Sequence, residues 1–207
     1  MVSHEPEVGL VPFAPDDPLL RAAVAMFERD GWIDLRLLAK EAGIGRATLY
    51  RRYGDRDRVL GEALWAVSVA IMKEVAPGYR GCGAQGIAET IGAVTQRGAD
   101  MPAMRHFVSQ HTDTALRVMT SKHGVVQGRF IAEIAKLIEL ELGEPPDIDA
   151  TTLAYGVQRI IESFYYRDLI TGDPADIPAA TVIITRLLTY QPREKSTLTR
   201  IEPPRPR

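Results

Sequence analysis

Two short helix-forming segments that meet across a tight, glycine-containing turn constrain the fold of this chain more than any other feature. The first runs from Asp34 to Ala42, where apolar residues at i, i+3 and i+4 spacing predict about two helical turns. Asp34 is placed to cap its start, and Gly43 can adopt the left-handed conformation that ends a helix. The second segment runs from Gly45 to Tyr53. Small residues between the two allow a close crossing.

The same helical spacing of apolar residues precedes these segments and continues through most of the chain. From Pro18 onward apolar positions lie on one helical face, with Asp17 as N-cap and Gly31 after the end. Further helices are predicted at 56–76, 84–99, 102–111, 125–142, 151–170 and 175–190. No alternation of apolar and polar residues typical of strands competes with them. The sequence therefore predicts an all-α fold.

Composition divides the chain into four parts. Residues 1–16 are rich in proline and acidic residues and are predicted to form a flexible arm. Residues 17–58 hold the three N-terminal helices, and residues 59–190 form a second helical domain. Residues 191–207 hold four prolines among arginines and a lysine, a composition that cannot bury enough apolar surface to order itself. We expect this last part to be a disordered tail.

The segment from residue 44 to 58 is basic, although the whole chain has a net charge of −2 and a pI of about 6.1. It holds five arginines and two aspartates, a local charge of +3. A basic helix-turn-helix is typical of a DNA-binding surface. Helical rotation turns Leu49 and Tyr53 inward and leaves the following residues outward: Arg46, Ala47, Thr48, Tyr50 and Arg51.

The alternative for this segment is an ordinary three-helix corner whose arginines form a solvated face. In that case Tyr50 is half-buried packing and Thr48 is a spacer. Arg52, which we include among the candidate DNA-binding residues, then pairs with Asp55 or Asp57. Arg58 has the same alternative role.

The residues LLAKEAGIGRATLYRRYGDRDRVL resemble the N-terminal signature of the TetR family of transcriptional regulators, a likeness that covers about residues 19–64. The resemblance implies that the residues facing the major groove or its flanking phosphates are Arg46, Ala47, Thr48, Tyr50 and Arg51. It also implies that Arg56 meets a phosphate at the start of the next helix. Two positions depart from the family pattern, because Gly45 replaces the usual Ser or Thr and Arg56 replaces the usual Lys. Gly45 weakens the helix cap.

Dimerisation is expected because one short reading helix gives modest specificity, and a dimer presents two such helices about 34 Å apart to a pseudo-palindrome. The resemblance implies that the last two helices form an intermolecular four-helix bundle. Their apolar stripes are Leu153, Val157, Ile160, Ile161, Phe164 and Leu169, and Ile177, Ala180, Ile184, Leu187 and Leu188. The alternative is that both stripes are buried within one chain, which periodicity alone does not distinguish.

The middle helices combine large apolar residues with a few polar groups, as ligand pockets do. The candidate ligand contacts are Met104, Phe107, His111, Phe130, Arg159, Glu162 and Tyr166. For each of them the alternative is a structural role in the core. The expected effector is a small apolar or amphipathic molecule.

Several other classes of function find no support in the sequence. Cys82 is the only cysteine, which excludes an internal disulfide framework and a cysteine metal cluster and fits a reducing cytoplasm. The N-terminus lacks a signal-peptide pattern, and no apolar run approaches the roughly 20 residues that cross a bilayer. His111 and Asp113 are neighbours without a nucleophile motif, and no phosphate loop or metal spacing is present. We expect no enzyme activity, no cofactor and no metal.

These observations predict an N-terminal three-helix helix-turn-helix DNA-binding domain followed by a C-terminal helical ligand-binding and dimerisation domain. The expected function is that of a cytoplasmic, homodimeric repressor that binds double-stranded operator DNA and releases it when an effector enters the C-terminal domain. One alternative is a DNA-binding regulator without a small-molecule ligand. The other is a helical enzyme or adaptor whose N-terminal corner only resembles a reading head.

Overall fold

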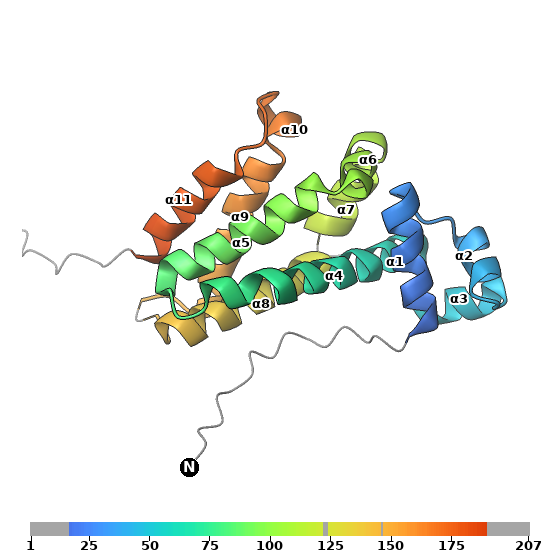
Figure 1. The fold of residues 1–207 in the computed structure, drawn as a ribbon, viewed down its shortest axis with the longest axis horizontal. Coiled ribbons are helices and arrows are strands. Elements are labelled where there is room, and N and C mark those ends of the chain that lie inside the picture. Colours follow the sequence, from blue (N-terminus) through green and yellow to red (C-terminus); the bar gives the residue numbers. More distant parts are fainter. Residues whose placement is uncertain (1–16, 122–123, 146, 190–207) are drawn as a thin grey trace, which may run out of the picture.

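The computed structural model describes residues 17–121, 124–145 and 147–189, and every regular element in these ranges is helical (Figure 1). The all-α prediction is therefore confirmed, while the predicted arm and tail lie outside the described residues. The helices are α1 (Pro18–Asp30), α2 (Leu35–Glu41), α3 (Arg46–Tyr53), α4 (Arg56–Val75), α5 (Gly83–Asp100), α6 (Pro102–Gln110), α7 (Thr112–Thr120), α8 (Val125–Leu142), α9 (Ala150–Tyr165), α10 (Arg167–Thr171) and α11 (Ile177–Leu188), with a short 3-10 helix at Ala76–Tyr79.

Helices α1, α2 and α3 form a head at one end of the molecule, with α11 towards the other end (Figure 1). Asp17 caps α1 as predicted, because its Oδ1 accepts a hydrogen bond from the Leu19 amide at 3.0 Å. Gly31 ends α1 in the left-handed conformation, with φ of 65°. A side chain at this glycine would collide with α6, since an added Cβ would lie 2.8 Å from the Ala103 carbonyl oxygen. The head therefore packs directly on α6.

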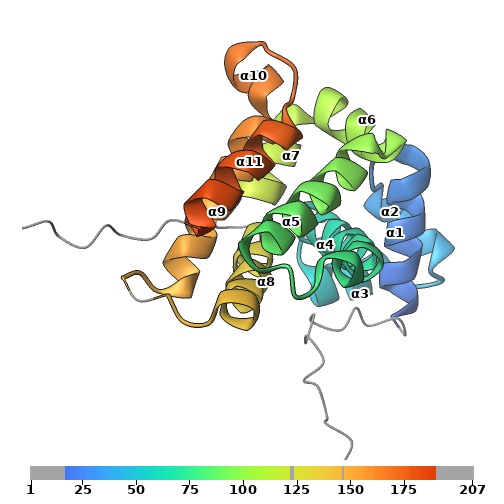
Figure 2. The ribbon, with the colours of Figure 1, turned by 60° about the vertical axis from the view of Figure 1, so that its left-hand side comes forward.

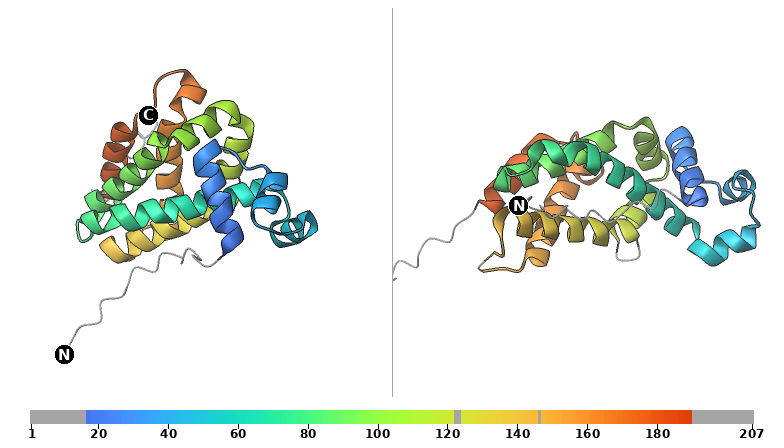
Figure 3. Two further views of the ribbon diagram at one scale, coloured as in Figure 1. Left: turned by 45° about the vertical axis from the view of Figure 1, so that its right-hand side comes forward. Right: turned by 60° about the horizontal axis from the view of Figure 1, so that its bottom comes forward.

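Helix α4 runs from the head into the rest of the molecule (Figure 3). Its first half buries Val59, Leu60 and Leu64 in a hydrophobic core shared with α1, α2, α3, α6 and α7. Its second half buries Val69 and Met72 in another cluster against α5. Helix α4 therefore supports the head with its first half and packs against α5 with its second half.

The remaining long helices, α5, α8, α9 and α11, pack around a third apolar cluster (Figure 2). This packing accounts for part of the two apolar stripes that were assigned to an intermolecular bundle. Five of the eleven residues of these stripes are buried inside the single chain, at most 5% exposed: Val157, Ile161, Ile177, Ala180 and Ile184. Leu169 and Leu187 of the same stripes remain exposed. The five buried side chains pack against α5 and α8 in one cluster, so they are not available to a second chain.

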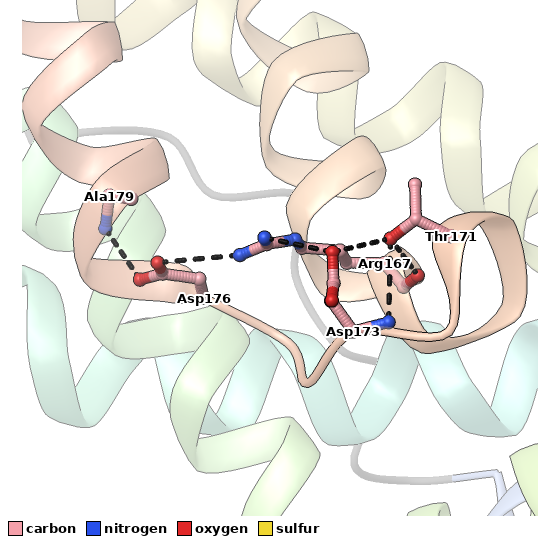
Figure 4. A network of polar contacts seen from close by, with 5 residues as sticks. All are labelled: Arg167, Thr171, Asp173, Asp176 and Ala179. Carbon is pink, nitrogen blue, oxygen red and sulfur yellow. Dashed lines mark hydrogen bonds and ion pairs between the residues drawn. The ribbon is translucent and has the colours of Figure 1, made fainter.

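The helices also differ from the sequence prediction in two places. The helix predicted over 151–170 is broken at Tyr166, which separates α9 from α10. Helix α7 lies in a stretch where no helix was predicted. The loop after α10 is held by Arg167, which lies 3.0 Å from an Asp173 carboxylate oxygen and 3.7 Å from one of Asp176 (Figure 4). Asp176 also caps α11 through the Ala179 amide, so this network fixes where α11 begins.

Candidate nucleic-acid interface and ligand cavity

The turn between α2 and α3 has the geometry that its glycines predict. Asp34 caps α2 by accepting hydrogen bonds from the amides of Arg36 at 2.7 Å and Leu37 at 3.0 Å. Gly43 has a φ of 66° and open space around it, so the backbone conformation rather than close packing requires a glycine there. The α2–α3 pair is therefore a tightly joined unit.

Helix α3 presents one exposed face to solvent. Leu49 is 1% exposed and anchors the helix in the core of the head. The predicted reading residues are all exposed: Arg46, Ala47, Thr48, Tyr50 and Arg51. Tyr50 is 43% exposed although it is a large aromatic side chain. Within the described residues neither Arg46 nor Arg51 forms an ion pair, so both guanidinium groups are available for contacts with another macromolecule.

The other arginines of the basic segment have partners inside the molecule. Arg52 lies 2.9 Å from an Asp17 carboxylate oxygen, and Arg58 lies 3.4 Å from Glu62. Asp57, which the sequence offered as their partner, binds Arg117 of α7 at 2.6 Å instead. Arg52 therefore differs from Arg46 and Arg51, because it has a structural partner.

Asp17 holds the C-terminal end of α3 against the start of α1. The Tyr53 hydroxyl donates a hydrogen bond of 2.6 Å to the same carboxylate oxygen that Arg52 contacts. Partial burial raises the pKa of Asp17, but the Tyr53 hydroxyl, the Leu19 amide and Arg52 together lower it below its usual value. Burial and this hydrogen bond raise the pKa of Tyr53. The charged carboxylate and the neutral phenol are therefore the stable pair.

Arg56, the predicted phosphate contact, lies over an aromatic stack. Its guanidinium carbon is 5.0 Å from the centre of the Trp32 ring, a cation–π distance. Trp32 also stacks on His111 at the α6–α7 junction, with ring centres 3.8 Å apart and planes 22° apart. Trp32, in the turn after α1, therefore orients Arg56 at the start of α4, and His111 between α6 and α7 supports Trp32.

A cavity lies beyond the head, with walls from α4, α5, α6, α7, α8 and α9. About 930 Å³ of empty space lies between its lining residues, a volume that includes open solvent at the mouth. Most lining residues are apolar, and the buried polar residues among them are Thr90, Glu133 and Gln158. The arrangement can hold a largely apolar molecule with one polar end.

Two family models match the chain in the order of these two regions. The model described as bacterial regulatory proteins, tetR family, matches residues 19–63. The model described as tetracyclin repressor-like, C-terminal domain, matches residues 82–189, more than half of the chain. The chain belongs to the TetR family. It is therefore a helix-turn-helix DNA-binding transcriptional regulator rather than an enzyme.

A solved structure shares the fold of this TetR-family regulator. It is described as the R. erythropolis transcriptional repressor QsdR from TetR family, with a TM-score of 0.75 and 22% sequence identity. The similarity covers 85% of this chain and 95% of that chain. No curated protein matches the sequence. In the described residues of the regulator, no helix is both long and apolar enough to cross a membrane.

The cavity brings together four of the seven candidate ligand contacts of the regulator: Met104, Phe130, Glu162 and Tyr166. The other three are placed elsewhere. Phe107 is fully buried in the core that α6 shares with the head. His111 stacks on Trp32, and Arg159 forms an ion pair with the cavity residue Glu162 without being among the lining residues itself.

Sequence reasoning missed the cavity residues of α4 and α5 and two polar residues, Glu133 and Gln158. The signal for Glu133 was present, because it falls on the apolar stripe of α8 between Phe130 and Leu137. A carboxylate on the buried face of a helix is rare unless it has a partner. The walls from α4 and α5 carried no such signal, since their apolar residues look like ordinary core.

Proposed function

We propose that this regulator is a repressor that binds a pseudo-palindromic operator as a homodimer and releases it when a small apolar or amphipathic molecule fills the cavity. The observation that carries the proposal is the exposed face of α3, where Arg46, Thr48, Tyr50 and Arg51 stand free above a buried anchor. Side chains of this kind on the second helix of a helix-turn-helix reach bases and phosphates of the major groove.

The residues of the interface divide into two groups by their partners. Arg46 and Arg51 are the candidates for base or phosphate contacts, with Thr48, Tyr50 and the small Ala47 at the groove. Arg56 is the phosphate contact at the start of α4, held in place by Trp32. Arg52 supports the helix through Asp17 and contributes its charge rather than a base contact.

Pairing of two chains uses the outer faces of α9 and α11. Their inner faces are buried within the chain, but large apolar side chains remain exposed on both helices: Tyr155, Val182, Ile183 and Leu187. Val182 is 61% exposed and Tyr155 is 51% exposed. Exposed apolar residues on two packed helices are typical of an interaction surface. Pairing of α9 and α11 with the same helices of a second copy would make a four-helix bundle.

The proposed release of DNA depends on helices that contact both the cavity and the head. Val67, Ile71 and Met72 of α4 line the cavity, and the same helix supports the head at Val59 and Leu60. Helices α6 and α7 likewise contribute Met104 and Met119 to the cavity, while His111 at the corner between them stacks on Trp32. A ligand that favours another position of α4 or of this corner changes the spacing of the two reading helices.

The test of DNA binding is a gel shift with the DNA upstream of the regulator's own gene, over a range of salt concentrations. Binding should weaken steeply with salt because phosphate contacts dominate affinity. Tyr50→Ala and Arg51→Ala should abolish binding while the melting temperature and the dimer mass stay unchanged. Lys73→Ala, an exposed cation at the far end of α4, is the matched control and should bind normally. Salt-insensitive binding, or none, contradicts the proposal.

A further inference from the structure

The polar end of the cavity is built from three side chains on α8 and α9. Glu133 is 2% exposed and Gln158 is 7% exposed, and both line the cavity with Glu162. Gln158 donates a hydrogen bond of 2.7 Å from its Nε2 to Glu162 Oε1. The cavity wall thus contains two carboxylates in surroundings that are otherwise mainly apolar.

Each carboxylate forms an ion pair with a cation that is not among the residues lining the cavity. Lys136 donates to Glu133 Oε1 at 2.7 Å from a side chain that is 45% exposed on the outer surface of α8. Arg159 forms an ion pair with Glu162. Among the lining residues that the structure describes, none is a lysine, arginine or histidine. A ligand in the cavity would therefore meet carboxylate oxygens that are already paired with cations, and no cation among the lining residues.

This arrangement discriminates between ligands by charge. An anionic head group would meet two carboxylates without a cation among the lining residues, and an unpaired buried charge is strongly unfavourable. A cationic head group would add a positive charge beside two carboxylates that Lys136 and Arg159 already neutralise, so its own charge would stay uncompensated. An uncharged group that donates a hydrogen bond fits both constraints, because an ionised carboxylate only accepts.

The neighbouring tyrosines do not change this charge balance. Tyr165 and Tyr166 line the cavity close to Glu162 along α9. Burial raises the pKa of Tyr165 to about 12. Burial also raises the pKa of Tyr166, whose hydroxyl donates to the Met119 sulfur at 3.4 Å. Both phenols are therefore neutral at physiological pH.

We propose that the effector of this regulator is an uncharged amphipathic molecule whose apolar body lies between α4 and α5 and whose polar end donates a hydrogen bond to Glu133 or Glu162. The inference rests on the proposed function, since it names the ligand of the same cavity. The apolar body has matching walls in Val67, Ile71 and Val94. Fatty-acid anions and organic ammonium ions are excluded as preferred ligands.

The test compares three molecules of one chain length that differ only in their head group: octanamide, octanoate and octylamine. Thermal shift and calorimetric titration are run on the full-length protein, below the aggregation limit of each compound. Octanamide should bind and raise the melting temperature. Octanoate should bind roughly a hundred-fold more weakly, because its charge stays unpaired. Octanoate or octylamine binding as tightly as octanamide, or no binding by any of the three, overturns the inference.

Variants of the carboxylates give a second readout. Glu162→Gln leaves Arg159 without its carboxylate and should shift the preference from octanamide towards octanoate by about ten-fold or more. Glu139→Gln removes a carboxylate from the exposed face of the same helix α8 as Glu133 and should leave the ranking unchanged. If Glu162→Gln does not fold, Glu133→Gln makes the same test at the other carboxylate. An unchanged ranking in the folded variant overturns the inference.

A gel shift without any amphiphile is run in parallel. DNA binding that persists while octanoate proves the preferred ligand removes the inference about head-group charge and leaves the repressor proposal standing. Loss of DNA binding in the ligand-free protein removes the proposed function itself. The two failures are therefore distinguishable.

Discussion

Asp17 connects two helices that lie far apart in the sequence. It caps α1 and accepts a hydrogen bond from Tyr53, 36 residues away, while Arg52 pairs with the same carboxylate. These contacts fix the C-terminal end of α3 against α1. The position of the exposed face of α3 thus depends on a residue that never contacts DNA in the proposed complex.

The charge of Asp17 should therefore contribute to stability in a pH-dependent way. Asp17→Asn keeps a capping oxygen but loses the charge, and at neutral pH it should lower the free energy of unfolding by about 1 kcal/mol. Because the folded-state pKa of Asp17 lies below 3.8, the wild-type advantage is present above pH 3.8 and disappears as the pH falls through the lowered pKa. Urea denaturation across this range measures it. The exposed Asp147→Asn is the control, and a pH-independent difference contradicts the assignment.

Trp32 is the second residue through which the head is positioned. Trp32→Leu keeps an apolar side chain but removes the ring under Arg56, so operator affinity should fall about five-fold, the value of roughly 1 kcal/mol of cation–π energy. The salt dependence should fall by about one phosphate contact. Trp32→Phe keeps an aromatic face and should bind nearly as the wild type does. A gel shift over several salt concentrations checks this, and equal losses in both variants would assign Trp32 to packing alone.

Sequence reasoning reached the residues whose role depends on local periodicity. The buried Leu49 and the exposed face of α3 follow from helical rotation over a single short segment. The partners of Arg52 and of Arg56 were not predictable in this way. Asp17 and Trp32 reach them through tertiary packing, and for Arg52 the sequence offers the nearer Asp55 and Asp57 as equally good partners.

At the scale of elements, α3 differs from the other helices of the head in the way it begins. Asp17, Asp34 and Asp55 cap α1, α2 and α4 through their side chains, whereas Gly45 at the start of α3 provides no such bond. The backbone of Gly45 is extended, with φ of −71° and ψ of 144°, and an added Cβ would meet nothing within 4 Å. A serine fits this position without strain.

Gly45→Ser should therefore stabilise the regulator by a few tenths of a kcal/mol, because its hydroxyl can accept an amide hydrogen bond from the first turn of α3. The same hydroxyl adds a polar group at the DNA-facing end, so operator binding should be equal or tighter. Gly43→Ser is the matched control two residues earlier, and its φ of 66° should make it about 1 kcal/mol destabilising. Thermal unfolding and a gel shift measure both. A destabilising Gly45→Ser would refute the missing cap.

The elements that the sequence did not predict have identifiable causes. Helix α7 has nine residues and buries only Ala115 and Val118, which is too short an apolar pattern to stand out among polar neighbours. The break between α9 and α10 depends on long-range contacts: the Asp176 amide donates to the Phe164 carbonyl, and Arg167 draws the following loop back (Figure 4). Periodicity continues across Tyr166, so the sequence alone favoured one helix.

At the scale of the whole molecule, the head and the cavity share structural elements rather than meeting at a loose linker. The core of the head includes Met104 and Phe107 of α6, Val118 of α7 and Val126 of α8. Met104 and Val126 also line the cavity. A change in cavity occupancy therefore acts on side chains that already touch the support of α3. This continuity is what a ligand-released repressor requires, because the ligand must favour one arrangement of the head over another.

In the proposed dimer, the outer faces of α9 and α11 hold the two copies together. Ile183→Asp places a charge on an exposed apolar residue of α11, so the protein should become monomeric and lose operator binding while its helical content is retained. Leu37→Asp on α2 is matched in exposure, 39% against 42%, and should keep the dimer mass. Light scattering after size exclusion measures the mass. A dimeric Ile183→Asp would place the interface elsewhere, and a monomer that still bound a full operator tightly would show that two reading helices are not needed.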